Sequence, residues 1–386
     1  MSVNWMPPSP RRGACWAEGI PEGRNGCVEV TPGLRQAGPM IPCLRSCAGG
    51  LVLLLLISLS GCVTSSPRSH RQVGESLVFI GEQPMSLACL PRDPILLRST
   101  FRPQSNTVTY LEGVDYFVDH GTGTLRRTPR SRIPDFRNNL LYGATNFDHS
   151  MFPGFGNTAF FAFADYQCAS KPPWPVQVDQ RFRLSRSVQR LNAGGLFKVV
   201  AFGDSITAGG DATSPDLIFW SRWVDHLRKT YPQASITAVN GATGGDSTVQ
   251  GLQRLEAKVL REKPDLVLIG FGMNDHNRGG VPVPQFAENL RTLVRQIRAE
   301  TSAEVILFSA FPPNPQWAFG THHMEDYAWV TAEVADELGA AYADVFNNWE
   351  AIARRKKTED LLGNNINHPN DFGHDLYYQV FLKLGL

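Results

Sequence analysis

Four short polar segments carry the residue types that nucleophilic attack on a carbonyl group requires. Ser205 stands in a Gly-Asp-Ser sequence, the glycine-rich segment 240–246 follows, Asn274 lies in Gly-Met-Asn-Asp, and His368 precedes Pro-Asn. A serine hydroxyl is a weak nucleophile by itself and needs an adjacent base such as histidine. N–H groups of glycines and asparagine side chains are the donors that stabilise an oxyanion. The four segments therefore suit acyl transfer, provided that the fold brings them together.

Short continuous apolar runs indicate the elements that position these segments. The runs span residues 198–202, 236–239, 266–271, 305–311 and 341–346. Apolar runs without alternation are typical of parallel strands that are covered on both faces. Between them, apolar residues recur at steps of three and four, as expected for helices. We predict an α/β fold for residues 196–386: a three-layer α/β/α sandwich with a mostly parallel five-stranded sheet, flavodoxin-like in its arrangement.

In such sheets, ligands bind at the carboxyl ends of the strands. Three of the polar segments come directly after a predicted strand, and His368 comes just before the last predicted helix. We therefore expect Ser205, the glycines, Asn274 and His368 to meet at one edge of the sheet.

The ordered set of segments resembles the SGNH (GDSL) hydrolase superfamily, and the resemblance covers about residues 198–386. It implies that Ser205 is the nucleophile of an acyl-enzyme mechanism and that His368 is its base. The backbone N–H of Ser205, the N–H of Gly245 and the Asn274 side chain would then hold the oxyanion. The resemblance implies neither a cofactor nor a metal ion. Among the neighbouring glycines, those at positions 241 and 244 are the alternatives to Gly245.

One position departs from the family pattern. The family usually has an aspartate three residues before the histidine, where this chain has Asn365. An asparagine can hold the histidine tautomer by a hydrogen bond, but it cannot stabilise an imidazolium by charge. Either His368 acts in a dyad helped by Asn365, or Asp371 or Asp360 orients it, or the protein is a weak or inactive relative. We favour the first two together, because the serine, the oxyanion donors and the histidine are retained.

The resemblance implies a serine ester hydrolase, and we expect an O-acetyl group on a carbohydrate or another envelope ester as its substrate. A lipid ester is the second choice for the substrate. A non-catalytic glycan-binding or scaffold protein and an acyltransferase are the alternative functions. The chain has 37 Lys and Arg against 36 Asp and Glu, so its charge gives no ground for a nucleic-acid partner.

An apolar run at residues 51–59 follows Arg45 and ends just before Cys62. It is too short to span a bilayer as a helix, which needs about 20 residues. A basic residue, a short apolar run and small residues in this order predict a signal peptide. The ending Leu-Ser-Gly-Cys resembles a bacterial lipobox, which implies lipidation of Cys62. We expect export and a lipid anchor in the bacterial cell envelope, at the outer membrane or the cell surface.

The chain before the α/β part divides into segments of different composition. We interpret residues 1–39 as a disordered leader or mis-assigned start, 40–61 as a lipoprotein signal peptide, 62–75 as a tether and 76–192 as an accessory β-rich domain. Short β-rich runs and frequent prolines argue against long helices in the last of these segments. Cys89 and Cys168 remain in the exported part and could form a disulfide, with two separate buried thiols as the alternative.

Overall fold

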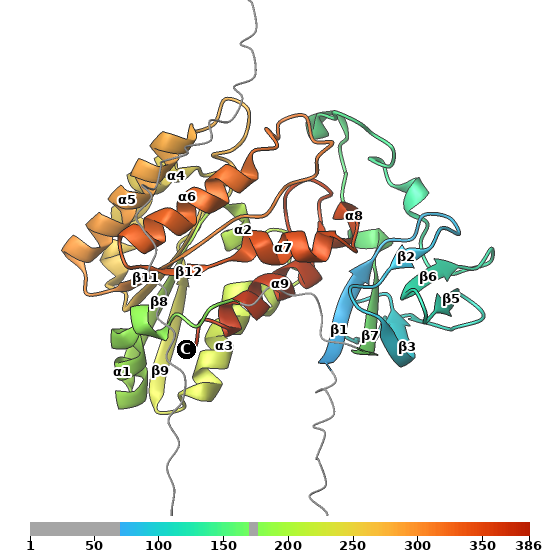
Figure 1. The fold of residues 1–386 in the computed structure, drawn as a ribbon, viewed down its shortest axis with the longest axis horizontal. Coiled ribbons are helices and arrows are strands. Elements are labelled where there is room, and N and C mark those ends of the chain that lie inside the picture. The colour runs from blue at the N-terminus through green and yellow to red at the C-terminus, as the bar shows by residue number, and fades with distance from the viewer. Residues whose placement is uncertain (1–69, 170–176) are drawn as a thin grey trace, which may run out of the picture. The chain divides into compact units, whose positions relative to one another are not determined.

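The computed structural model describes residues 70–169 and 177–386 (Figure 1). Cys62, the predicted signal peptide and most of the predicted tether lie outside these residues. Among the residues described, no helix combines the length and the hydropathy that a membrane span needs. The β-rich part and the α/β part belong to one compact unit.

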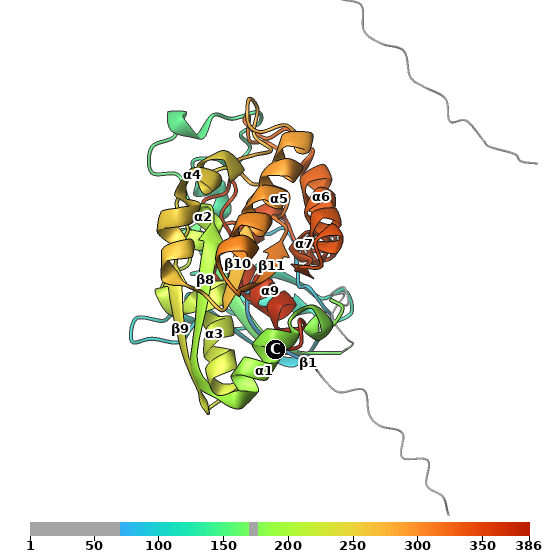
Figure 2. The same cartoon turned by 90° about the vertical axis from the view of Figure 1, so that its left-hand side faces the viewer.

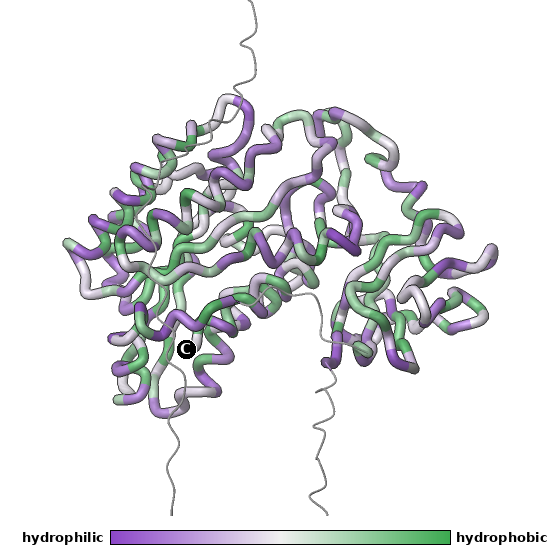
Figure 3. Tube along the Cα trace, viewed as in Figure 1, coloured by the Kyte–Doolittle hydropathy of each residue, from purple (hydrophilic) through white to green (hydrophobic). Residues whose placement is uncertain are grey.

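Five parallel strands form the central sheet in the order β12-β11-β10-β8-β9. They are β8 (Gly195–Gly203), β9 (Ala234–Asn240), β10 (Leu266–Gly270), β11 (Glu304–Phe308) and β12 (Ala341–Ala343). All residues of β10 and β11 are buried, which explains why these strands are apolar apart from Glu304 (Figure 3). The parallel sheet and its strand order confirm the predicted fold class.

Helices cover both faces of this sheet (Figures 1 and 2). One layer holds α4 (Thr248–Lys258), α5 (Val283–Glu300) and α6 (Met324–Glu337), and the other holds α3 (Phe219–Thr230), α7 (Val345–Ala353) and α9 (Asp371–Leu382). Three further helices are α1 (Ser185–Ala193), α2 (Ser205–Ala208) and α8 (Thr358–Leu361). Each long helix buries an apolar stripe against the strands, as its spacing predicts.

Short 3-10 helices complete the connections. They are η1 (Phe136–Asn138), η2 (His149–Met151), η3 (Thr158–Phe160), η4 (Arg181–Arg183), η5 (Pro215–Leu217) and η6 (Leu260–Glu262).

The N-terminal β-rich part contains two antiparallel sheets, in the orders β1-β7-β3-β4 and β2-β6-β5. Their strands are β1 (His70–Leu77), β2 (Met85–Ser86), β3 (Pro91–Arg98), β4 (Thr109–Tyr110), β5 (Tyr116–Asp119), β6 (Thr124–Arg127) and β7 (Ala162–Cys168). Strand β1 begins at His70, so residues 70–75 belong to a sheet and not to the predicted tether. Helix α1 lies within the range predicted for the β-rich domain, but it packs against β8 and β9.

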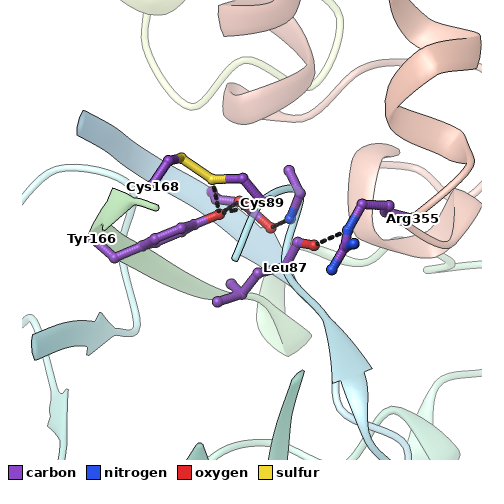
Figure 4. The surroundings of a disulfide bond; sticks show 7 residues. Leu87, Cys89, Tyr166, Cys168 and Arg355 are labelled. Carbon is purple, nitrogen blue, oxygen red and sulfur yellow. Dashed lines mark hydrogen bonds between the residues drawn. A yellow bond between two sulfur atoms is a disulfide. The ribbon is translucent and has the colours of Figure 1, made fainter. Parts of the chain in front are cut away.

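Cys89 and Cys168 form a disulfide, so they are not the two separate thiols of the alternative interpretation (Figure 4). The Tyr166 hydroxyl lies 3.4 Å from Cys89 Sγ and donates a hydrogen bond to Glu75. Close by, Arg355 Nε donates to the Leu87 carbonyl at 2.8 Å. The disulfide thus joins Cys89 to the end of β7. It lies near Leu87, where Arg355 contacts the β-rich part.

Buried polar contacts tie β1 to the segment that leads to His368. Lys356 Nζ lies 3.0 Å from Glu75 Oε1, and both side chains are fully buried. Asp360 accepts the backbone N–H of Val78 at 2.8 Å, and the backbone N–H of Asn157 donates to Gly363 O at 2.7 Å. The β-rich part therefore holds the loop between α7 and α9 in place.

Candidate active site

Ser205 lies at the carboxyl edge of the central sheet, where β8 ends and α2 begins. Asp204 caps this short helix by accepting the backbone N–H of Ile206 at 2.9 Å. A Cβ atom on Gly203 would lie 2.2 Å from Gly270 O, so only glycine allows β8 to end this close to β10. The Gly-Asp-Ser sequence therefore makes the tight turn that presents Ser205.

His368 reaches Ser205 from the loop between α8 and α9. The Asn364 side chain holds this loop, because its Oδ1 accepts the backbone N–H groups of Ile366, Asn367 and His368 at 2.9, 3.0 and 3.0 Å. His368 Nε2 lies 2.9 Å from Ser205 Oγ. The structure thus brings the two predicted residues together at the distance that proton transfer requires.

Asp211 contacts the other nitrogen of the imidazole. Its Oδ2 lies 2.8 Å from His368 Nδ1, and both side chains are partly exposed. The turn after α2 delivers this carboxylate through backbone that favours glycine: φ is 104° at Gly209, and 59° at Asp211 itself. At Gly210, a Cβ atom would lie 2.8 Å from His368 Nδ1, so the ring packs directly on the glycine backbone.

Neither Asn365 nor Asp371 takes the predicted orienting position, and the same holds for Asp360. Asn365 is buried with a φ of 58° and contacts Asn314. Asp371 accepts the backbone N–H and the hydroxyl of Thr213 at 2.9 and 2.8 Å. The Asp360 carboxylate accepts the backbone N–H of Val78, just after β1, as described above. The predictions that Asn365, Asp371 or Asp360 orients His368 are therefore wrong, because Asp211 occupies the position at His368 Nδ1.

Sequence reasoning missed Asp211, although one signal was present. The residue follows Gly-Gly immediately after the segment that carries Ser205, and two glycines permit a sharp reversal of the chain. A carboxylate on any loop at the same sheet edge is a candidate partner for the histidine. The family pattern instead predicts the carboxylate three residues before His368.

A second histidine supports the Asp211 turn from behind. His374 is fully buried, and its Nε2 lies 3.1 Å from the Gly210 carbonyl. Burial lowers the pKa of His374 to about 4, so the ring is neutral near pH 7 and donates its Nε2–H to that carbonyl. The ring stacks on Phe219 with an interplanar angle of 13°. His374 therefore fixes the backbone beneath His368.

The glycine loop after β9 contacts Ser205 through Gly244. A Cβ atom on Gly244 would lie 3.8 Å from Ser205 Cβ, whereas the space beside Gly245 is open. The backbone N–H of Gly241 instead donates to the Ala201 carbonyl at 2.8 Å, so Gly241 is not a donor candidate. In the described part of the chain, no hydrogen bond uses the backbone N–H of Ser205, Gly244 or Gly245. Both Gly244 and Gly245 remain candidates, and Gly244 lies nearer to the nucleophile.

Asn274 is held against the same glycine loop. Its Nδ2 donates to the Asp246 carbonyl at 2.9 Å. The adjacent Asp275 is fully buried, and it accepts the backbone N–H of Thr248 at 2.9 Å and that of Gly272 at 3.1 Å. Burial raises the pKa of the Asp275 carboxyl. Through its two hydrogen bonds, the Asp275 carboxyl joins the start of α4 to the loop that carries Asn274, and so it fixes the direction of the Asn274 amide.

Within residues 70–169 and 177–386, no group of three or more His, Cys, Asp or Glu side chains is placed to hold a metal ion. At the sheet edge, a serine, a histidine and an aspartate are joined by hydrogen bonds. Beside them lies a glycine loop whose N–H groups can donate to a ligand oxygen. Together these groups can activate a hydroxyl and stabilise the oxyanion that follows from its attack.

Comparison with known proteins identifies the family. Residues 201–376 match the model of the GDSL-like lipase/acylhydrolase family. Esterase TesA of Pseudomonas aeruginosa is 33% identical over 151 residues, which cover 38% of this chain and 70% of TesA. The chain belongs to the GDSL-like lipase/acylhydrolase family. The prediction of a carboxylic ester hydrolase is thereby confirmed.

Two other similar proteins extend the comparison of this GDSL-family chain. An acetylxylan esterase of Geobacillus stearothermophilus is 23% identical over 210 residues, which cover 50% of this chain and 95% of that enzyme. A solved structure of a two-domain esterase active on acetylated mannans, co-crystallised with mannopentaose, is 26% identical with a TM-score of 0.45. That match covers 52% of this chain and 53% of the other. The family match begins at residue 201 and leaves out the β-rich part.

Proposed function

We propose that this GDSL-family protein hydrolyses esters through an acyl-enzyme, with Ser205, His368 and Asp211 as its catalytic residues. The observation that carries the proposal is the unbroken path from Ser205 Oγ to His368 Nε2, at 2.9 Å, and from His368 Nδ1 to Asp211 Oδ2, at 2.8 Å. The same order of groups activates the nucleophile in serine hydrolases of unrelated folds.

In the acylation step, Ser205 Oγ bonds to the ester carbonyl carbon while its proton passes to His368 Nε2. The carbonyl π electrons move to the oxygen, and the N–H groups at Ser205 and Gly244 or Gly245 and the Asn274 amide stabilise that charge. Removal of one such donor costs about 10²–10³ in kcat in a studied protease. The tetrahedral intermediate then collapses, and the alcohol leaves with the proton from His368.

In the deacylation step, His368 takes a proton from water, and the hydroxide bonds to the acyl carbon. The Ser205 oxygen leaves and recovers its proton from the imidazolium, so the free acid and the enzyme are regenerated. Asp211 holds the Nδ1–H tautomer and stabilises the imidazolium of both steps by its charge.

For the substrate, we propose an O-acetyl ester of a carbohydrate. The acetylxylan esterase of Geobacillus stearothermophilus is a similar protein whose name includes such a substrate, which supports this choice. A lipid ester remains the alternative, and transfer of the acyl group to an alcohol in place of water is the alternative reaction.

We also propose export and lipid anchoring at Cys62, on the sequence of residues 45–62. The disulfide between Cys89 and Cys168 supports the export, because disulfides persist in oxidising compartments. Expression with labelled palmitate tests the anchor. Label that is present in the wild type and absent in Cys62→Ala supports it, and an unlabelled wild type contradicts it.

Fluorophosphonate labelling tests the enzyme mechanism. We expect covalent labelling of the wild type, loss of labelling in Ser205→Ala, and hydrolysis of p-nitrophenyl acetate that follows the same pattern. Acyl chains of graded length then separate short-chain from long-chain preference. Folded wild type that neither labels nor hydrolyses any ester would support the non-catalytic scaffold instead.

A further inference from the structure

A cavity of about 460 Å³ opens beside Asp211. Segments 99–104 and 158–163 of the β-rich part form one wall, and segments 211–217 and 370–371 of the α/β part form the other. Its size falls in the range of small-molecule sites, about 300–1,000 Å³. The first wall lies before residue 201, outside the region that matches the GDSL family.

The proposed mechanism places the leaving oxygen of the ester beside His368, whose far nitrogen is bonded to a residue of this cavity. His368 must protonate the leaving oxygen, so the alcohol lies on the imidazole side of Ser205. Asp211 is bonded to the far nitrogen of the same ring, and it also lines the cavity. The cavity therefore begins on the Nδ1 side of the imidazole, one ring away from the leaving oxygen at Nε2, so an alcohol reaches it only by extending past His368.

The lining combines an aromatic wall with polar groups. Phe101, Phe161 and Phe163 are buried and pack on one another, with centroid distances of 5.9 Å from Phe163 to each of the other two. Gln104 and Thr158 lie exposed on the same wall. Among the described residues, neither the Gln104 amide nor the Thr158 hydroxyl has a hydrogen-bond partner, so both can bind a ligand.

The base of the cavity is preformed. Asn370 and Asp371 are buried in it, and their side chains are already engaged: Asn370 with Ser76 and Asp371 with Thr213. Arg102 at the rim is paired with Asp216, so the described lining residues offer no free cation that would select a phosphate.

We propose that this cavity binds the alcohol portion of the ester, and that this alcohol is a carbohydrate. A sugar ring presents an apolar face, which packs on aromatic rings, and hydroxyls, which bond to the Gln104 amide and the Thr158 hydroxyl. An alkyl chain would form no hydrogen bond with those polar groups. The accessory β-rich part thereby determines the substrate class, and this inference rests on the proposed esterase function.

Two variants of the first wall test the inference, each with a matched control. Thr158→Trp fills the cavity, and Gln104→Ala removes a donor and an acceptor from its rim. Thr230→Trp on α3 and Gln296→Ala on α5 make the same changes at exposed positions outside the cavity. The substrates are an O-acetylated xylotetraose, an O-acetylated mannotetraose and p-nitrophenyl acetate.

We expect Thr158→Trp to lower kcat/KM for the acetylated oligosaccharides by about tenfold or more, and Gln104→Ala to raise their KM by about threefold to tenfold. Both variants should keep kcat/KM for p-nitrophenyl acetate within about twofold of the wild type, because its small acyl group and rigid alcohol do not need the polar rim. The two controls should leave the kinetics unchanged on both kinds of substrate.

Binding gives a readout that does not depend on turnover. Calorimetry on Ser205→Ala should detect the acetylated oligosaccharide, and adding Thr158→Trp should weaken its Kd by about tenfold. Equal losses on both kinds of substrate, or unchanged oligosaccharide kinetics in both wall variants, would overturn the inference. A change in acyl-length preference in Thr158→Trp would assign the cavity to the acyl chain instead. Ser205-dependent hydrolysis of p-nitrophenyl acetate without any sugar deacetylation overturns the sugar subsite and leaves the esterase intact.

Discussion

Asp211 and His368 are 157 positions apart in the sequence, yet their side chains meet at 2.8 Å, and the other side of the imidazole faces Ser205. The family usually supplies this carboxylate from the histidine's own loop. In this chain the turn after α2 supplies it, and Asn365 occupies the usual position with its side chain directed to Asn314. Asp211 and Ser205 thus come from one short segment.

Asp211→Asn should abolish most of the activity without unfolding the protein. An asparagine at Nδ1 cannot stabilise the imidazolium by charge, and the same change cost about 10⁴ in kcat in a serine protease. Hydrolysis of p-nitrophenyl acetate, with circular dichroism as the folding check, measures this. Asn365→Asp is the matched variant, and it should neither raise wild-type turnover nor rescue Asp211→Asn. Full activity in Asp211→Asn would show that His368 works without this carboxylate.

Gly210→Ala should displace the imidazole. The added Cβ atom would lie 2.8 Å from His368 Nδ1 and 3.0 Å from its Cε1, which is closer than real contacts allow. We expect a loss of about tenfold to a hundredfold in kcat, because small misplacement of a catalytic group is costly. Gly320→Ala is the control, since its nearest neighbour would lie at an ordinary 3.5 Å. Equal effects of the two substitutions would argue against direct packing of the ring on Gly210.

Lys356→Met should destabilise the whole molecule. It leaves Glu75 buried without its ion pair, and removal of one partner of such a pair costs about 3–5 kcal/mol. Urea unfolding, followed by fluorescence, gives the free energy. Arg261→Ala, which breaks an exposed pair with Glu256, should cost less than about 1 kcal/mol. Similar costs for both substitutions would mean that the buried pair does not hold the β-rich part to the α7–α9 loop.

His374 should make folding stability depend on pH. Burial lowers its pKa from 6.5 to about 4 in the folded protein, so between these values the unfolded chain binds a proton that the folded protein does not. The contribution of the neutral ring is therefore complete above about pH 6.5 and is lost as the pH falls toward about 4. Urea unfolding of the wild type and His374→Gln at neutral and acidic pH measures this. Their difference in unfolding free energy should shrink at acidic pH, and a constant difference would contradict the assignment.

The sequence alone predicted the parallel sheet, and it indicated Ser205 and His368 as the candidate nucleophile and base. Apolar runs such as that of β10 are typical of covered strands, and Gly-Asp-Ser after such a strand places Ser205 at the carboxyl edge. The order of the four polar segments then indicated His368 and Asn274. These inferences depend on local patterns, in which each residue's role follows from its neighbours in the chain.

Only the folded chain shows Asp211 beside His368 and the two walls of the cavity. Asp211 acquires its role because left-handed backbone at Gly209 and Asp211 reverses the chain, and because a distant loop brings His368 over Gly210. Strand β1 holds that loop through Glu75, which no spacing in the sequence reveals. Contacts across the fold depend on the relative placement of distant segments, and composition and periodicity carry no information about that placement.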